Sequence, residues 1–298
     1  MRMPLSQKGR LVAGFESVWV DLQGVPFSQG YLNAGGVRTR YLHAGDRDKP
    51  PLVLLHGSGG HAEAYVRNLE SHAEHFSTWS MDMLGHGYTD KPGHPLEIRH
   101  YVEHLRAFLD AIGAQRAHLS GESLGGWVVS RFAVDHPDRL DRLVLNTAGG
   151  SQADPEVMKR IITLSMAAAE NPSWETVQAR IKWLMADKSK DYDDIVASRR
   201  RVYRQPGFVG AMRDIMALQD PEIRQRNLLG PADYGAISAP TLVLWTSDDP
   251  TADVGEGRRI AQMIPGARFE VMAGCGHWPQ YEDPKTFNRL HIDFLLGR

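Results

Sequence analysis

Apolar runs typical of buried strands alternate with helical patterns along most of the chain. Residues 51–55, Pro-Leu-Val-Leu-Leu, are apolar throughout, as expected of a strand buried on both faces of a parallel sheet. Residues 98–112 carry apolar side chains at spacings of three and four, which predicts an amphipathic helix. Strands that alternate with helices predict a parallel sheet covered by helices on both faces. The other elements expected here are a short strand at 18–20, two strands around an Ala-Gly-Gly turn within 31–42, a helix at 64–76, a strand leading into Gly121, and strands at 78–82, 140–147, 239–245 and 268–272.

The alternation stops at Gly150, and helical patterns replace it. Asp154 before a proline and Ser173 before Trp-Glu are typical N-caps of helices. We therefore expect a core domain of residues 1–150 and 233–298, with a helical lid of residues 151–232 inserted between the sixth and seventh strands. The helical stretches expected in the lid are 154–169, 173–186, 191–204 and 207–219.

Apolar residues of this lid could form its own core or line a substrate pocket, and the pattern favours a core role for most of them. The run Arg199-Arg200-Arg201 lies within one predicted helix. Neighbouring positions on a helix differ by about 100 degrees, so at most two of these arginines face inward. The apolar positions in question are Met158, Ile161, Met166, Trp183, Leu184, Met185 and Met216.

The pattern Gly121-Glu122-Ser123-Leu124-Gly125 joins a predicted strand to a predicted helix, which is the context of a nucleophile elbow. Such a turn holds the serine in strained backbone geometry and points its hydroxyl away from the sheet. The amide of Leu124, at the start of the helix, would face a developing negative charge above Ser123. Ser123 is therefore the candidate nucleophile.

A second glycine-rich loop, His56-Gly57-Ser58-Gly59-Gly60, follows the strand at 51–55. Loops at the carboxyl ends of strands carry the ligand sites of open α/β sheets. We expect the amide of Ser58 to complete an oxyanion hole with that of Leu124. His56 precedes the turn, which favours a structural role in which it packs and holds the loop.

The remaining partners of a serine nucleophile would follow the last two strands. His277 lies in a glycine-containing loop after 268–272, and the order Ser, Asp, His is the order known for this architecture. Asp248 and Asp249 both follow the strand at 239–245, and either could orient His277 while the other bonds to turn amides. Asp253 precedes a helix and has Glu256 three residues later, so we assign it to a capping box.

Composition excludes several classes of partner. The 298 residues carry a formal charge of −2, which gives no basic surface for nucleic acid or anionic membranes. The single cysteine, Cys275, forms no intramolecular disulfide, and no apolar run reaches the length of a membrane span. Residues 1–14 lack the apolar region of a signal peptide. We expect a cytoplasmic protein with a small-molecule substrate and neither metal nor organic cofactor; a homo-oligomer, dimeric or larger, is compatible with the sequence.

With these motifs the chain resembles the α/β-hydrolase fold family across nearly its whole length. Within that family it is most similar to the meta-cleavage product hydrolases, which split carbon–carbon bonds in vinylogous 1,5-diketones made by aromatic ring opening. The narrower similarity is carried by three stretches: Asn-Ala-Gly-Gly-Val-x-Thr-Arg-Tyr-Leu at 33–42, Asp-Met-Leu-Gly-x-Gly at 82–87, and Gly-His-Trp at 276–278.

The resemblance implies an eight-stranded, mostly parallel sheet and assigns further residues. The acid of the family falls on Asp249. A lid arginine that grips the substrate carboxylate matches Arg199, and Trp278 would line the pocket beside the loop glycines Gly57 and Gly59. Two features depart from the family: Glu122 replaces an asparagine that often precedes the nucleophile, and the glycine-rich loop is short and lacks its own asparagine.

The expected function is hydrolysis of a carbon–carbon bond in a 2-hydroxy-6-oxo-hexa-2,4-dienoate type ring-fission product by Ser123, Asp249 and His277. A carboxylesterase, lactonase or thioesterase would use the same three residues. A ligand-binding homologue without activity is a third alternative, against which the intact triad argues. Relatives with an aspartate nucleophile are excluded because position 123 is serine.

Overall fold

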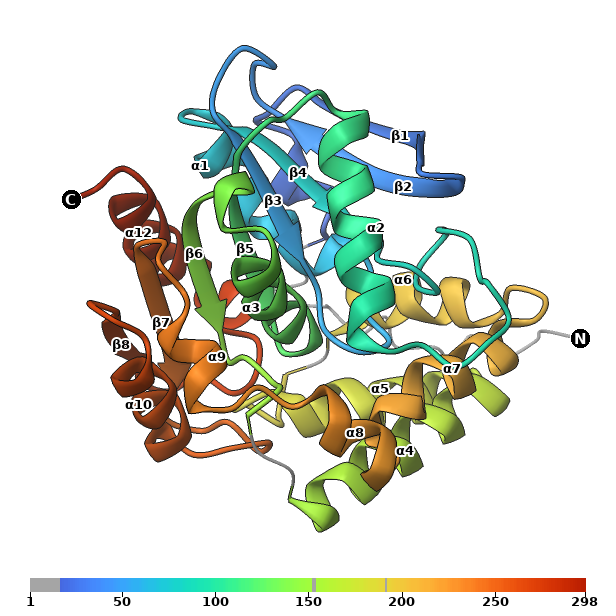
Figure 1. Cartoon of the computed structure of the whole chain (residues 1–298). Helices are drawn as coiled ribbons and strands as arrows, with labels where there is room; N and C mark the ends of the chain where they lie inside the picture. Colours follow the sequence, from blue (N-terminus) through green and yellow to red (C-terminus); the bar gives the residue numbers. More distant parts are fainter. Residues whose placement is uncertain (1–16, 152–153, 191) are drawn as a thin grey trace, which may run out of the picture.

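An eight-stranded sheet runs through the centre of the protein (Figure 1). The computed structural model describes residues 17–151, 154–190 and 192–298. Residues 1–14, in which no signal peptide is expected, lie outside the described part. The strand order is β1-β2-β4-β3-β5-β6-β7-β8; β2 pairs antiparallel with β1 and β4, and all other pairs are parallel. This confirms the mostly parallel sheet. The strands are β1 (Phe27–Ala34), β2 (Val37–Ala44), β3 (Pro51–Leu55), β4 (Ser77–Met81), β5 (Ala117–Glu122), β6 (Leu140–Asn146), β7 (Thr241–Thr246) and β8 (Arg268–Met272).

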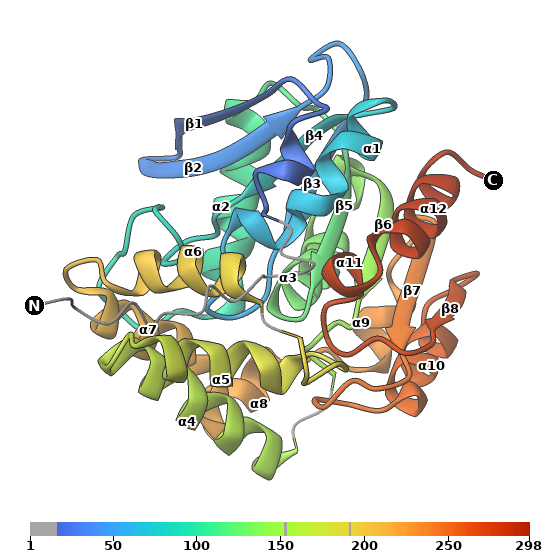
Figure 2. The same ribbon diagram turned by 180° about the vertical axis from the view of Figure 1, so that it is seen from behind.

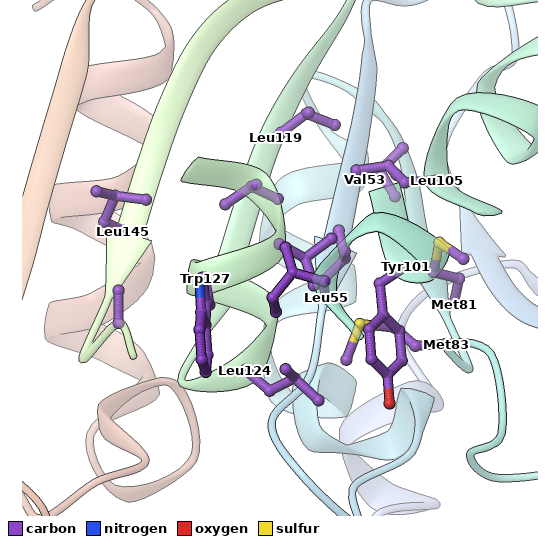
Figure 3. Close-up of a cluster of buried hydrophobic side chains, with 14 of the residues drawn as sticks. Val53, Leu55, Met81, Met83, Tyr101, Leu105, Leu119, Leu124, Trp127 and Leu145 are labelled. Atoms are coloured by element: carbon purple, nitrogen blue, oxygen red, sulfur yellow. The ribbon is translucent and has the colours of Figure 1, made fainter. Parts of the chain in front are cut away.

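Helices cover both faces of the sheet. Val53 and Leu55 of β3 pack into one apolar layer with side chains of α2 (Ile98–Ala111), α3 (Leu124–Asp135) and α10 (Val254–Met263). Leu52 and Leu54 pack into a second layer with residues of η2 (Ala62–Asn68) and α12 (Pro284–Leu295). Because side chains alternate along a strand, burial on both faces explains why β3 is apolar at every position. Figure 3 shows the first layer, where side chains of the central strands meet those of α2 and α3.

The flanking helix α2 confirms the helix predicted at 98–112 and ends one residue before the predicted end. In place of the one helix predicted at 64–76, the 3₁₀ helix η2 begins two residues earlier and is followed directly by the short α1, which ends three residues before the predicted end. The flanking helices are η1 (Val20–Leu22), η2 (Ala62–Asn68), α1 (Leu69–Ala73), α2 (Ile98–Ala111), α3 (Leu124–Asp135), η3 (Pro137–Arg139), α10 (Val254–Met263), α11 (Pro279–Glu282) and α12 (Pro284–Leu295).

The short strand expected at 18–20 is not formed. The amide of Val20 donates to the carbonyl of Ser17, and the amide of Trp19 donates to the Ser17 hydroxyl, so the chain turns into η1. The side chains of Trp19 and Val20 are exposed. These residues gave the apolar pattern of a strand, but they lie at the surface and do not pair with a strand of the described sheet.

A helical insertion, residues 155–235, lies between β6 and β7 and gathers at one end of the sheet (Figures 1 and 2). Four helices fall within the predicted stretches or extend one residue beyond, and α8 and α9 were missed. Both missed helices are short and begin with a proline. The division into a core and a lid stays a prediction. The insertion contains α4 (Pro155–Glu170), α5 (Trp174–Leu184), α6 (Asp193–Tyr203), α7 (Phe208–Met216), η4 (Ala217–Gln219), α8 (Pro221–Asn227) and α9 (Pro231–Gly235).

Among the described residues, no helix combines the length and the apolar character that crossing a membrane requires.

Candidate active site

Ser123 lies in a strained turn between β5 and α3. Its φ of 53° and ψ of −114° fall outside the regions that residues with a side chain prefer. The strain is fixed on both sides, because the Ser123 amide donates to the carbonyl of Asn146 at 3.1 Å and the Ser123 carbonyl accepts from the amide of Gly149 at 2.9 Å. A Cβ atom on Gly121 would come within 2.2 Å of the backbone of Gly125, so only glycine allows so close a turn.

A cavity of about 240 Å³ opens beside this turn. Ser123 and Leu124 line it from the elbow, Ser58 from the glycine-rich loop, and His277 from the loop after β8. The helical insertion contributes Met158, Ile161, Arg180 and Leu184 among others. Three of the seven apolar insertion residues named above thus reach the cavity, and the other four are not among its described lining residues.

The imidazole of His277 is held between two carboxylates. Its Nδ1 lies 2.8 Å from Oδ2 of Asp249, whose other oxygen accepts from the hydroxyl and the amide of Thr251 at 2.7 and 2.8 Å. Its Nε2 lies 3.2 Å from Oε1 of Glu122. Asp248 is exposed and accepts from the Ser247 hydroxyl. The geometry therefore brings Asp249 rather than Asp248 to His277.

Ser123 and His277 share the cavity, but in the described part of the chain no hydrogen bond joins their side chains. The Nε2 atom that would take the proton of Ser123 faces Glu122 instead. The pKa of His277 is raised: burial of the ring opposes protonation, but the charge and hydrogen bond of Asp249 and the charge of Glu122 outweigh it. The resting imidazole is thus biased toward the imidazolium form.

The loop that carries His277 is attached to the helical insertion. The His277 amide donates to the carbonyl of Leu184, at the end of α5, at 2.7 Å. The carboxylate of Glu282 accepts from the amides of Gly276 at 2.9 Å and of Ala186 at 2.7 Å. A displacement of α5 would therefore move the histidine.

His56 has the structural role that its position predicted. It is fully buried; its Nδ1 lies 2.8 Å from the carbonyl of Gly57, and its Nε2 accepts from the amide of Met83 at 3.1 Å. Burial lowers the pKa of His56 to about 3, so the ring stays neutral. It joins the glycine-rich loop to the loop after β4.

Asp253 and Cys275 also take the structural positions expected of them. Asp253 caps α10 by accepting from the amide of Glu256, but the Glu256 side chain pairs with Arg259, so only half of a capping box forms. Cys275 is buried. Over the described ranges, no group of three or more His, Cys, Asp or Glu side chains is placed to hold a metal ion.

A family model described as alpha/beta hydrolase fold matches residues 50–284. The chain belongs to this family. Among curated hydrolases, the 2-hydroxy-6-oxo-6-phenylhexa-2,4-dienoate hydrolase of Comamonas testosteroni is 34% identical over 274 residues, which are 87% of this chain and 91% of that protein. The 2-hydroxy-6-oxononadienedioate/2-hydroxy-6-oxononatrienedioate hydrolase of Paraburkholderia phymatum is 31% identical over 283 residues, 89% and 94% of the two chains.

A solved structure of a meta-cleavage product hydrolase from Pseudomonas fluorescens IP01 matches with a TM-score of 0.77 and 27% identity, over 92% of this chain and 98% of that one. The predicted α/β-hydrolase fold and the similarity to meta-cleavage product hydrolases are therefore confirmed.

In this α/β hydrolase the arginines that line the cavity, Arg180 and Arg224, differ from the one singled out in the sequence. Arg199 is buried with its guanidinium 4.7 Å from the ring of Trp278, and neither residue is among the described residues that line the cavity. Arg180 lines the cavity, donates through Nε to Ser165 at 3.1 Å, and has no hydrogen-bond partner at Nη1 in the described part of the chain. A lone arginine within an expected helix gave no signal of this position.

The glycine-rich loop reaches the cavity through one residue. Ser58 lines it, whereas Gly57 and Gly59 are not among its described lining residues. Gly59 has a φ of 69°, and its carbonyl accepts from the hydroxyl of Tyr203 at 2.8 Å. The loop is thus fixed to α6 of the helical insertion.

Proposed function

We propose that this α/β hydrolase cleaves a carbon–carbon bond in ring-fission products of the 2-hydroxy-6-oxo-hexa-2,4-dienoate type. The observation that carries the proposal is the strained Ser123 in one cavity with a His277 held by Asp249. The curated relatives, named as hydrolases of such dienoates, support the substrate class.

Ser123, His277 and Asp249 take the roles of nucleophile, acid–base group and orienting carboxylate. Neutral His277 removes a proton from Ser123, or from a water, as the substrate carbonyl is attacked. The amides of Ser58 and Leu124 stabilise the oxyanion, and one such donor typically contributes about 3 kcal/mol in the transition state. Hydrolysis of the carbon–carbon bond requires the dienol to ketonise first, so that the leaving carbanion is an enolate.

A buried arginine binds the carboxylate of the substrate by paired hydrogen bonds. Arg180 is favoured for this role because it lines the cavity with an unpaired Nη1. Arg199 remains the second candidate, since its Nε and Nη2 are buried without a partner in the described part of the chain. Trp278, Gly57 and Gly59 shape the site behind these groups.

The decisive experiment follows the yellow dienolate absorbance after mixing with a ring-fission product. We expect rapid loss of absorbance and release of both cleavage products with wild-type protein, and no cleavage products with Ser123→Ala, whose folding is checked by circular dichroism. If wild-type protein leaves the dienoate unchanged but hydrolyses p-nitrophenyl esters, the function is that of an esterase. Retention of most activity by Ser123→Ala would refute the role of Ser123 as the nucleophile.

A further inference from the structure

Glu122, the residue before the nucleophile, is a buried carboxylate for which a serine–histidine–aspartate mechanism has no use. It is completely buried at the end of β5, and neither carboxylate oxygen receives a hydrogen bond from the described residues. Burying such a group without hydrogen bonds is costly unless a nearby charge compensates it. The position therefore calls for a functional explanation.

The compensating charge is on His277. Oε1 of Glu122 lies 3.2 Å from Nε2, on the opposite side of the ring from Asp249 at Nδ1. The carboxylate is also held close to the glycine-rich loop, since a Cβ atom on Gly57 would lie 2.6 Å from Oε2. Two carboxylates on the two nitrogens of one buried ring favour a proton on each nitrogen.

We propose that Glu122 is a positioning residue that holds His277 as an imidazolium in the resting enzyme, so that the ring first acts as an acid toward the substrate and only then as a base. This inference rests on the proposed function. A single imidazole then performs both steps that carbon–carbon hydrolysis requires, in the order in which they are required.

The proton balance of the first step is simple. The N–H bond at Nε2 of His277 breaks, and a C–H bond forms at C5 of the bound dienolate. The electron pair of the dienolate oxygen becomes the carbonyl bond at C2, so the negative charge of the dienolate and the positive charge of the ring both disappear. His277 is left neutral, with a lone pair on Nε2 that can accept the proton of Ser123.

Other charged groups act on this pair from the surrounding elements. Arg180 on α5 opposes protonation of His277, and Arg199 on α6 favours the ionised form of Glu122, while Tyr65 on η2 is held neutral beside it. Burial and, less strongly, the charge of Asp249 raise the pKa of Glu122, whereas the charge of His277 and the backbone of Gly57 oppose this shift. The ion pair at 3.2 Å and the carboxylate of Asp249 are the groups that keep the proton on the ring.

The test compares Glu122→Gln, which removes the charge and keeps the size, with Glu122→Asp, which keeps the charge and shortens the side chain. Two reactions are followed against pH: loss of dienolate absorbance, which needs the imidazolium, and hydrolysis of p-nitrophenyl acetate, which needs the neutral ring. The pKa of His277 is measured separately by NMR titration of the free enzyme.

In Glu122→Gln we expect the pKa of His277 to fall by about one unit or more, the usual effect of losing an opposite charge at this distance. The alkaline limb of dienolate decay and the acid limb of ester hydrolysis should then both move to lower pH. At neutral pH, dienolate decay slows by about tenfold while ester hydrolysis is maintained or rises. Glu122→Asp should stay closer to wild type than Glu122→Gln in all three measurements.

A matched control is Glu63→Gln, which removes a partly buried carboxylate paired with Arg40 and His61. It should leave the alkaline limb of dienolate decay and the acid limb of ester hydrolysis unchanged. An unchanged NMR titration of His277 in Glu122→Gln would overturn the proposal, as would a parallel loss of both reactions or a larger effect of Glu122→Asp. A wild-type enzyme that does not consume the dienoate would instead overturn the proposed function and, with it, the acid step. The titration would still decide whether Glu122 holds the imidazolium.

Discussion

Two buried histidines, His56 and His277, both lie in loops at the cavity end of the sheet, yet their partners give them opposite chemistry. His56 is bonded to two backbone groups, and burial lowers its pKa to about 3. His277 is buried almost as deeply, but it faces the carboxylates of Asp249 and Glu122, and its pKa is raised. Burial alone therefore does not determine whether a histidine takes part in proton transfer; the charge of its partners does.

The comparison predicts opposite consequences of the same substitution. We expect His277→Gln to reduce kcat/KM for the dienoate and for a p-nitrophenyl ester by about 10⁴-fold, the upper range for an acid–base group. His56→Gln should retain activity to within about tenfold, because it changes only the support of a loop. Steady-state kinetics on both variants, with circular dichroism as a folding check, measures this; comparable losses in the two would contradict the distinction.

A second substitution tests the two neighbouring aspartates. Asp249→Asn should lower kcat by about 10³- to 10⁴-fold, because the amide neither stabilises the imidazolium nor reliably selects the right tautomer. Asp248→Asn changes an exposed side chain and should alter kcat by less than about twofold. If both variants lost activity alike, the 2.8 Å contact between Asp249 and His277 would not describe the working enzyme.

The candidate nucleophile could be predicted from the sequence, because a local pattern determines where it lies. The elbow at Ser123 needs a strand, two close glycines and a helix, all within one stretch of chain. The choice between Asp248 and Asp249 needed a family resemblance, since both follow the same strand and differ only in which way the turn directs them. The order of residues along the chain does not indicate which of the two side chains faces His277.

Residues of the helical insertion were harder to predict. Arg199 was selected from its neighbours in sequence, whereas Arg180 reaches the cavity because α5 ends against the His277 loop. How the inserted helices pack over the sheet is not encoded in the spacing of any one helix. The contact between Glu122 and His277 was missed for the same reason: the two residues are brought together only by the fold.

The histidine comparison also predicts how stability depends on pH. The pKa of His56 is about 3 in the folded protein and about 6.5 in an unfolded chain, so its contribution is complete above pH 6.5 and is lost as the pH falls toward 3. In wild-type protein this one group steepens the fall in the free energy of unfolding by up to about 1.4 kcal/mol per pH unit.

Urea unfolding of wild type and His56→Gln at several values between pH 7 and pH 4.5 measures this contribution. The variant should be less stable at pH 7, where it loses a buried hydrogen bond, and its stability should fall less steeply below pH 6.5. Equal slopes in the two proteins would show that His56 is accessible to protons in the folded state. Burial also lowers the pKa values of His72 and His104 to about 4. These two residues therefore contribute to the fall in the free energy of unfolding with decreasing pH in both proteins.

A smaller loss than that of Asp249→Asn is expected at Thr251, which supports the pair of His277 and Asp249 without carrying charge. Its hydroxyl donates to Oδ1 of Asp249 at 2.7 Å, so Thr251→Val removes one of the two donors that fix the carboxylate, while the amide donor remains. A lost hydrogen bond of this kind corresponds to about a tenfold fall in kcat. Thr251→Ser keeps the hydroxyl and should restore most of that activity. Because Thr251 also lines the cavity, KM is the discriminating quantity: an orienting role lowers kcat at nearly constant KM, whereas a rise in KM alone would assign the hydroxyl to substrate binding.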